Sequence, residues 1–173
     1  METIKSLTKE VAAATGSKKA QLVLKNARIV NVFTQSVEEG DIAIEEGRIV
    51  GIGTYDGVME SDLKGAYVCP GFLDGHIHIE SSMTSPGEFE RAVVPHGTTA
   101  VITDPHEIAN VYGREGVVYM HDAAEGLPMR QLVDIPSCVP AVPGCENAGA
   151  AFMAEDIEAL AELPRAVGLA EVM

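Results

Sequence analysis

The spacing of apolar and polar positions divides the chain into parts of different character. Near the N-terminus, Ile4, Leu7 and Val11 recur at helical spacing, which predicts a short amphipathic helix that ends at Gly16. The segments that follow are rich in Val and Ile and are separated by turn-forming Glu-Gly and Asp-Gly pairs. This pattern predicts a small antiparallel β unit that ends at a Pro-Gly boundary. Its expected strands cover residues 21–32, 41–44, 48–52 and 66–69.

From Phe72 onward, segments with the pattern of strands alternate with segments with the pattern of helices. Ser85, Pro86 and Glu88 have the order of an N-cap, a first helical position and a capping box, which predicts a helix that ends near His96. Alternation at this spacing implies βαβ units and a parallel sheet, with ligands at the carboxyl ends of its strands. The expected strands cover 72–79, 98–103, 131–137 and 166–172, and two further helices are expected between 108 and 124 and over 154–163.

Four strands and three helices make half of an eightfold barrel, which typically needs about 250 residues. We therefore predict an α/β fold, in which the first half of a (β/α)8 barrel follows a small β-rich, partial sandwich segment. The expected organisation is an N-terminal helix in 1–19, the β segment in 20–70 and the half-barrel in 71–173. Because the last predicted strand runs almost to the final residue, we expect a piece of a longer protein. A complete open sheet is the alternative.

Charge and composition exclude several classes of protein. The net charge is −14, and residues 71–173 carry sixteen acidic residues against four Arg, so this part would repel a nucleic-acid backbone. No apolar run approaches the roughly 20 residues of a membrane span, and the N-terminus lacks a signal-peptide pattern. The three cysteines contain no Cys-x-x-Cys pair, which fits a reducing compartment. We expect a cytoplasmic protein without nucleic-acid or membrane partners.

The strongest local motif is a His-x-His pair, His76 and His78, at the end of the first barrel strand. Side chains two positions apart on a strand point to the same side, roughly 6 to 7 Å apart, so both imidazoles can reach one metal ion. Neutral imidazole suits Zn, Fe and Mn alike. A pair of surface histidines is the alternative, but the position directly after an apolar strand favours a metal site.

Two segments, PGFLDGHIHIESSM and PHGTTAVITDPHEIANVYG, resemble the amidohydrolase superfamily and, within it, the adenine deaminase branch. The first contains the superfamily signature at the end of the first barrel strand. Its continuation Glu80-Ser81-Ser82-Met83 and the stretch from Asp104 to Asn110 resemble the adenine deaminase branch more specifically. The resemblance extends over the chain from about residue 20. It implies that residues 20–70 match the β-rich piece that precedes the barrel, which strands from the C-terminal end normally complete.

The resemblance also implies a site and a reaction. His76 and His78 would hold one metal, and Glu171, where many relatives carry a carboxylated Lys, would bridge to a second. The implied ions are manganese or iron, although these ligands would also accept zinc. The implied reaction is hydrolytic deamination of adenine to hypoxanthine and ammonia, with a hydroxide attacking C6. The acid/base group and further ligands would lie on later strands, so we expect this chain alone to be inactive and the full-length protein to form a homo-oligomer.

Polar residues beside these motifs are candidates for substrate binding or for support of a metal ligand. His106 and Glu107 follow the second strand, where they could meet a purine edge or hold a ligand, or else cap the next helix. Glu80 and Ser81 follow the His pair and could do the same, or make ordinary loop hydrogen bonds. Asp104 belongs to the same group of candidates.

The sequence also allows alternatives to these expectations. His78-Ile79-Glu80 matches half of the zinc signature of cytidine deaminases, but the required Pro-Cys-x-x-Cys is absent. His96 is expected to end a helix, and His121 is expected to be structural. Two other functions remain open: another amidohydrolase reaction on a cyclic amide or imidazolone, and a non-catalytic half-barrel that serves as an interaction module.

Overall fold

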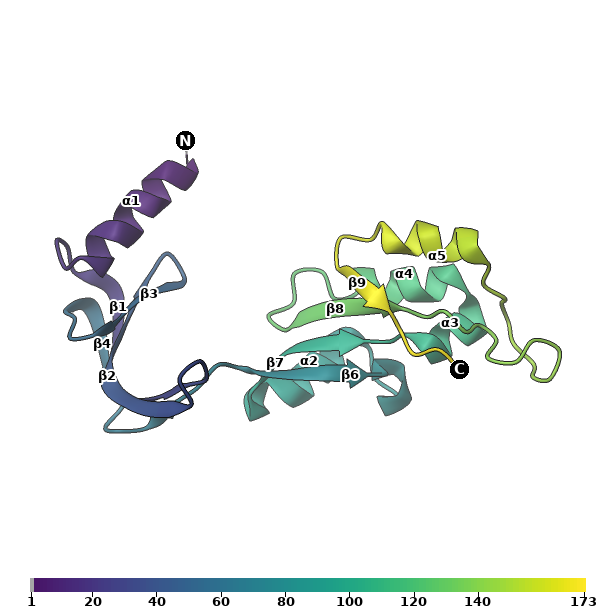
Figure 1. Ribbon diagram of the computed structural model, residues 1–173, viewed down its shortest axis with the longest axis horizontal. Helices are drawn as coiled ribbons and strands as arrows, with labels where there is room; N and C mark the ends of the chain where they lie inside the picture. Colours follow the sequence, from purple (N-terminus) through teal and green to yellow (C-terminus); the bar gives the residue numbers. More distant parts are fainter. Residues whose placement is uncertain (1) are drawn as a thin grey trace. The chain divides into compact units, whose positions relative to one another are not determined.

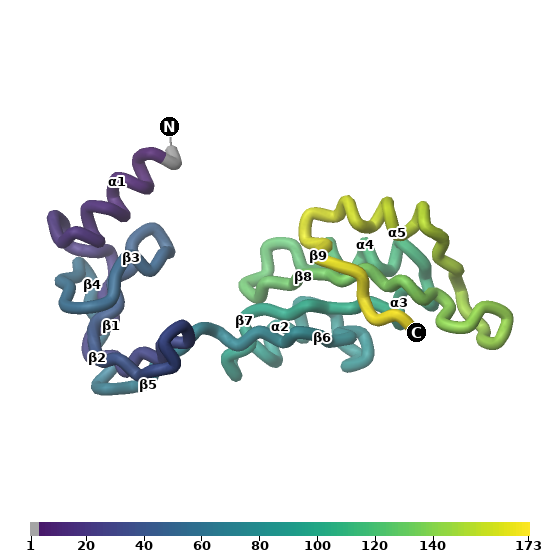
Figure 2. The backbone as a smooth tube through the Cα atoms, viewed as in Figure 1, coloured from purple at the N-terminus to yellow at the C-terminus, as the bar shows by residue number. Residues whose placement is uncertain are grey.

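The computed structural model describes residues 2–173 (Figures 1 and 2). The chain divides into two compact units, Met1–Pro70 and Gly71–Met173. Among the described residues, no helix is long and apolar enough to cross a membrane.

The first unit is a helix followed by a five-stranded mixed sheet. Its strand order is β3-β2-β1-β4, and β5 also pairs with β1. β1 pairs antiparallel with β2 but parallel with β4 and β5, so the prediction of a purely antiparallel unit was wrong. β4 escaped prediction because its last five residues are exposed and its sequence does not alternate apolar with polar positions. The elements are α1 (Glu2–Ala14), β1 (Ala20–Asn31), β2 (Ser36–Glu45), β3 (Arg48–Gly53), β4 (Gly57–Asp62) and β5 (Tyr67–Val68).

Helix α1 contacts the sheet through its C-terminal end. Ala13 is fully buried with Ala20, Val23 and Ala43 in one apolar cluster. The side chains from which the helix was predicted, those of Ile4, Leu7 and Val11, are instead exposed. The spacing thus identified the helix correctly, but the apolar face it defines is not the face that packs on this sheet.

The second unit is a four-stranded parallel sheet in the order β6-β7-β8-β9 with helices between consecutive strands. This architecture confirms the predicted α/β half-barrel, since each strand pairs in parallel with the next along the chain. The strands are β6 (Phe72–Ile77), β7 (Thr98–Thr103), β8 (Arg130–Ile135) and β9 (Ala166–Leu169). The helices are α2 (Pro86–Val93), α3 (His106–Tyr112), α4 (Arg114–Asp122) and α5 (Ala154–Ala161), with short 3-10 turns η1 (Ile79–Ser82) and η2 (Val94–His96).

Local details of the second unit differ from the sequence predictions. The structure has two helices where a single helix was expected between residues 108 and 124. Gly113 has a positive φ of 69°, which interrupts the helix and separates α3 from α4. Ser85 stands at the N-cap of α2, but its side chain makes no capping hydrogen bond, and Glu88 pairs with Arg91 instead. Strand β9 ends at Leu169, so Glu171 follows the strand rather than lying within it.

Two apolar clusters form the core of the second unit. One joins α2, α3, α4 and β7 around Val101 and Met120, and the other joins α3, α4, α5 and β8 around Val117 and Val133. The outer strands are less well covered: Phe72, Leu73, Val167 and Leu169 on β6 and β9 are all more than half exposed.

Gly116 marks a close approach between α3 and α4. A Cβ atom at this position would lie 2.8 Å from the carbonyl oxygen of Ile108, which is backbone and cannot easily move. We expect Gly116→Ala to lower the free energy of unfolding by about 1–3 kcal/mol, measured by denaturant titration. Gly87→Ala in α2 is the control, because its Cβ would meet only Leu127 Cδ2 at 3.9 Å. Equal stability of the two variants would contradict this account of the contact.

Candidate metal centre

The carboxyl ends of three strands bring the predicted site residues of the second unit to one edge of the sheet. His76 lies near the end of β6 and His78 directly follows the strand, which ends two residues earlier than predicted; Asp104 and His106 follow β7, and Glu171 follows β9. The end of β7 is fixed to the end of β6, because the backbone N–H of Asp104 donates to the carbonyl of Ile77 at 2.9 Å. Residues distant in sequence therefore meet where a parallel α/β sheet holds its ligands.

The His76 and His78 imidazoles converge. Their Nε2 atoms lie 3.1 Å apart and the rings are nearly perpendicular, with an interplanar angle of 81°. One ligand atom from each imidazole and one carboxylate oxygen of Glu171 all lie within 4.8 Å of one another. Two ligands bonded to one divalent ion at about 2.0–2.2 Å lie roughly 3 Å or a little more apart. The residues present thus fit a metal ion by both chemistry and spacing.

Glu107 supports His78 from the side away from this meeting point. Glu107 Oε2 lies 3.0 Å from His78 Nδ1, and the Ser81 hydroxyl donates to Glu107 Oε1 at 2.7 Å. Partial burial raises the pKa of Glu107, but the Ser81 hydrogen bond and the His78 ring outweigh it and leave this pKa below its usual value. An ionised carboxylate beside the second imidazole nitrogen is a common way of orienting a ligating histidine.

The Glu80 carboxylate contacts the start of helix α3. Its Oε1 accepts the backbone N–H of Ile108 at 3.2 Å, so it occupies the N-terminus of α3. Burial raises the pKa of this carboxyl. Glu80 therefore caps helix α3. This is the role that the sequence allowed as an alternative for His106 and Glu107.

Asp104 and His106 form a second group of converging ligands that also includes Glu171. Asp104 is completely buried, and burial raises the pKa of its carboxyl. His106 is 7% exposed, and its Nε2 lies 2.7 Å from the backbone carbonyl oxygen of Cys138. Ligand atoms of these two residues and of Glu171 also fall within 4.8 Å of one another. Sequence reasoning did not find the Cys138 carbonyl, because a backbone acceptor carries no residue-type signal.

The remaining histidines lie away from both clusters. His121 is buried in α4 with its Nδ1 2.8 Å from Asp122 Oδ1, and His96 is exposed in η2 at the end of α2. Neither belongs to the groups of converging ligands found among the described residues.

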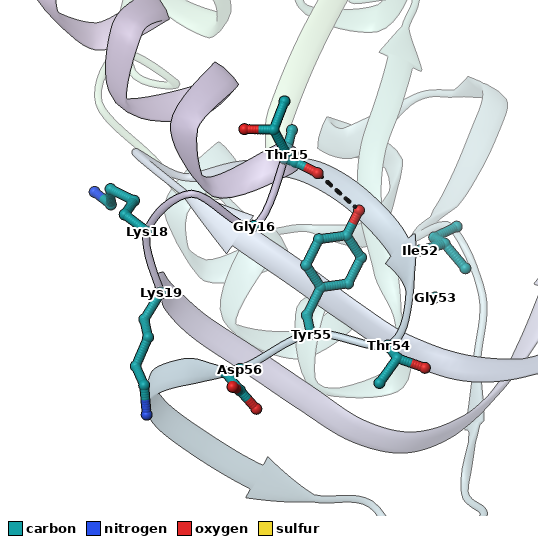
Figure 3. Close-up of a pocket in the computed structure, with 10 residues that line it drawn as sticks. Thr15, Gly16, Lys18, Lys19, Ile52, Gly53, Thr54, Tyr55 and Asp56 are labelled. Carbon is teal, nitrogen blue, oxygen red and sulfur yellow. Dashed lines mark hydrogen bonds between the residues drawn. The ribbon is translucent and has the colours of Figure 1, made fainter.

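The first unit contains a cavity of about 470 Å³ (Figure 3). It lies between the end of α1 and the loop before β4, where the Tyr55 hydroxyl donates to the carbonyl of Ala14 at 3.2 Å. Lys18, one of two lysines on its wall, already pairs with Glu45 at 2.6 Å. Asp56 is the one carboxylate among the residues that line it, and His is absent from that lining. This cavity therefore offers no set of converging ligands comparable with the edge of the barrel sheet.

A parallel half-barrel with imidazoles and carboxylates converging at its carboxyl edge has the construction of a metal-dependent hydrolase barrel. The chain belongs to the amidohydrolase family, whose model matches residues 67–171. This match spans all of the barrel strands and every candidate site residue.

Curated relatives are similar over nearly the whole chain. Adenine deaminase from Geobacillus kaustophilus is 52% identical over 168 residues, which is 97% of this chain and 29% of that protein. Adenine deaminase from Halalkalibacterium halodurans is 51% identical over 170 residues, which is 96% of this chain and 29% of that protein. The chain thus spans less than a third of the length of these relatives.

Solved structures share the fold at low sequence identity. β-Aspartyl dipeptidase from Fervidobacterium islandicum, solved with a β-Asp-Leu dipeptide, superposes with a TM-score of 0.56 at 17% identity, covering 90% of this chain and 42% of that one. N-acyl-D-glutamate deacylase from Bordetella bronchiseptica, solved with zinc and a phosphonate inhibitor, gives a TM-score of 0.55 at 17% identity, covering 88% and 38%. At this identity the likeness shows the fold alone.

Proposed function

We propose that the full-length protein is an adenine deaminase, which hydrolyses adenine to hypoxanthine and ammonia. The observation that carries this proposal is the convergence of His76, His78 and Glu171 in a chain about 50% identical to proteins of that name. We propose the organisation predicted above, with a helix in 1–19, a β segment in 20–70 and a half-barrel in 71–173. The exposed apolar side chains on β6 and β9 support this, because further barrel strands in the full-length protein would cover them.

His76, His78 and Glu171 would hold divalent ions, proposed to be manganese or iron. When bound there, such ions supply the Lewis acidity that makes a hydroxide nucleophile available at neutral pH. Glu107 holds the orientation of the His78 ring, and Ser81 in turn fixes the carboxylate of Glu107. These contacts give Glu107 and Ser81 a positioning role.

Hydrolysis at C6 of a purine also needs a group that moves protons to the ring and to the leaving ammonia. His76, His78 and Glu171 are proposed as metal ligands, Glu80 holds a helix end, and Glu107 lies beside the His78 ring. We propose that the proton-transfer group and the remaining ligands lie outside residues 1–173, and that the polar edge of adenine meets the site on the side of Asp104 and His106.

Adenine and hypoxanthine differ in ultraviolet absorbance, so conversion can be followed directly. We expect the full-length protein loaded with Mn²⁺ or Fe²⁺ to convert adenine, and residues 1–173 alone to leave the spectrum unchanged. A panel of cyclic amides and imidazolones serves as the comparison. Turnover of one of these compounds, and not of adenine, would overturn the proposed substrate, and conversion of adenine by residues 1–173 alone would overturn the need for groups outside them.

A further inference from the structure

Two residues that follow β8, Ser137 and Cys138, lie on an anchored segment at the carboxyl edge of the sheet. The next residue, Val139, is 4% exposed and packs in the apolar cluster around Val133. Its carbonyl accepts the backbone N–H of Phe152 at 2.7 Å, which ties the segment to the chain just before α5. The side chains of Ser137 and Cys138 are therefore presented from a fixed backbone.

The backbone carbonyl of Cys138 faces the residues that follow β7. Its oxygen lies 2.7 Å from Nε2 of His106. A carbonyl oxygen only accepts, so the proton of the neutral imidazole is on Nε2 and the lone pair is on Nδ1. The His106 ring is buried, and a hydrogen bond to a backbone carbonyl is a common way of fixing the orientation of such a ring. Cys138 therefore sets both the tautomer and the direction of His106.

The side chains of Ser137 and Cys138 face the residues that follow β9. The sheet itself ends where the Ala170 N–H donates to the carbonyl of the last residue of β8 at 3.0 Å. Beyond this point the Ser137 hydroxyl donates to the Glu171 carbonyl at 3.4 Å, and the Met173 N–H donates to Cys138 Sγ at 3.1 Å. The Cys138 thiol also lies 3.8 Å from the Met173 carbonyl oxygen. Together these bonds hold the backbone on both sides of the Glu171 side chain.

We propose that Cys138 is a positioning residue for the metal centre of the proposed function. Its sulfur, together with the Ser137 hydroxyl, holds the backbone that carries Glu171, while its carbonyl orients His106. Glu171 is exposed and lies outside the sheet, so its carboxylate keeps its place only if the backbone beneath it is held. This role rests on the proposed function, because it requires that Glu171 bind a metal ion.

A direct bond from Cys138 to the metal is the rival interpretation. Thiolate sulfur is a strong ligand for zinc. Among the described residues, however, Cys138 belongs to neither group of converging ligand atoms. Its sulfur accepts the Met173 N–H and its thiol faces the Met173 carbonyl, so the backbone already occupies it. The geometry therefore assigns Cys138 to the support of ligands.

The test is the Mn²⁺ affinity of the full-length protein, measured by titration of the metal-free protein in competition with a chelating indicator. We expect Cys138→Ala to weaken this affinity by about 10-fold or more, as loss of a support for a ligand commonly does. Cys138→Ser should bind Mn²⁺ more tightly than Cys138→Ala, because a hydroxyl can still accept the Met173 N–H. Cys145→Ala is the matched control, since Cys145 is exposed in the same loop between β8 and α5. Equal Mn²⁺ affinities of Cys138→Ala and Cys145→Ala would overturn the proposal.

A double variant shows whether Cys138 acts through Glu171. In Glu171→Gln the positioned carboxylate is gone, so adding Cys138→Ala should change the remaining Mn²⁺ affinity by less than about twofold. A merely structural effect of Cys138 would appear in full in this background, and that result overturns the proposal. Unchanged Mn²⁺ affinity in Glu171→Gln alone overturns the ligand set of the proposed function and this role with it. Weakened binding in Glu171→Gln with normal binding in Cys138→Ala overturns only the positioning role.

Thiol reactivity gives a measurement on the unsubstituted full-length protein, which serves even if the variants fail to fold. When Mn²⁺ holds Glu171, the backbone of Met173 should stay on Cys138 and shield its sulfur. We expect Mn²⁺ to slow the alkylation of Cys138 by iodoacetamide severalfold and to leave that of the exposed Cys145 unchanged, as read by mass spectrometry of the labelled peptides. Equal rates of Cys138 alkylation with and without Mn²⁺ would count against the proposal and overturn it.

Discussion

Replacing His76 or His78 by Ala in the full-length protein is expected to reduce adenine turnover by about a thousandfold or more and to remove one metal equivalent. The two Nε2 atoms lie 3.1 Å apart, so both imidazoles can bind the same ion. Removing either one leaves that ion with a single imidazole ligand from this pair. Catalytic metal ions contribute several kcal/mol to transition-state stabilisation, and about 4 kcal/mol corresponds to this factor. The measurements are the rate of adenine loss and the metal content of the purified variants.

A graded series makes this expectation sharper. Glu107→Gln removes the charge that faces His78 Nδ1 but leaves the ligands, so we expect a smaller loss of about 10–100-fold. His96→Ala is the matched control, because His96 is exposed at the end of a helix away from the cluster, and it should retain full activity. Wild-type metal content and turnover in both His76→Ala and His78→Ala would remove the pair from the ligand set.

The second large effect concerns stability. We expect Asp41→Asn to destabilise the first unit by about 2–4 kcal/mol, because its carboxylate is nearly buried and accepts three bonds. Lys25 Nζ donates at 2.5 Å, and the backbone N–H groups of Asn26 and Tyr55 donate at 3.1 and 3.2 Å. The variant leaves the Lys25 charge without its carboxylate partner. Denaturant unfolding followed by circular dichroism measures the change.

Glu39→Gln is the control for this experiment. Glu39 also pairs with a basic residue, Arg28, but at 3.9 Å and with both side chains well exposed. Exposed pairs contribute little, so we expect a change below about 0.5 kcal/mol. If Asp41→Asn were no more destabilising than Glu39→Gln, the bonds of Asp41 would not be an important source of stability.

The effect of Asp41 should depend on pH in a defined direction. Burial raises the pKa of this carboxyl, but the bonds from Lys25 and two backbone N–H groups outweigh it, and the net pKa lies below its ordinary value. A group with a lowered pKa in the folded state stabilises the protein fully above its unfolded pKa of about 3.9 and loses that contribution as the pH falls through the folded value. The stability gap between wild type and Asp41→Asn should thus be constant near neutral pH and narrow below about pH 4.

The barrel half of the fold was predictable because its sequence signals are strong and local. Strand β7 was predicted with its observed limits, Thr98–Thr103, since five of its six residues are Thr, Val or Ile and a Gly precedes it. The break between α3 and α4 was missed, because the residues on either side of Gly113 continue a helical pattern and a glycine inside such a pattern is often tolerated. The parallel pairing of β4 with β1 was missed because such pairing depends on tertiary contacts and not on turn residues.

The candidate site was predictable to a similar extent. The His-x-His spacing and the positions after strand ends indicated His76, His78 and the residues after β7, and the structure brings their ligand atoms together with Glu171. The division of labour among the acidic residues was not predictable. Glu80 and Glu107 both follow strands, yet one holds a helix end and the other an imidazole, and only the three-dimensional contacts separate them.

The wide separation in sequence of the converging ligands has a consequence for how the metal enters. His76 stands at the start of the second unit and Glu171 close to its end, and β6 and β9 are the outer strands of the sheet. His76 and His78 are neighbours in sequence, so only Glu171 has to be brought to them by the sheet that runs from β6 to β9. We therefore expect the ligand set to be completed only when the sheet has formed, and we expect the folding rate measured with and without Mn²⁺ to be the same.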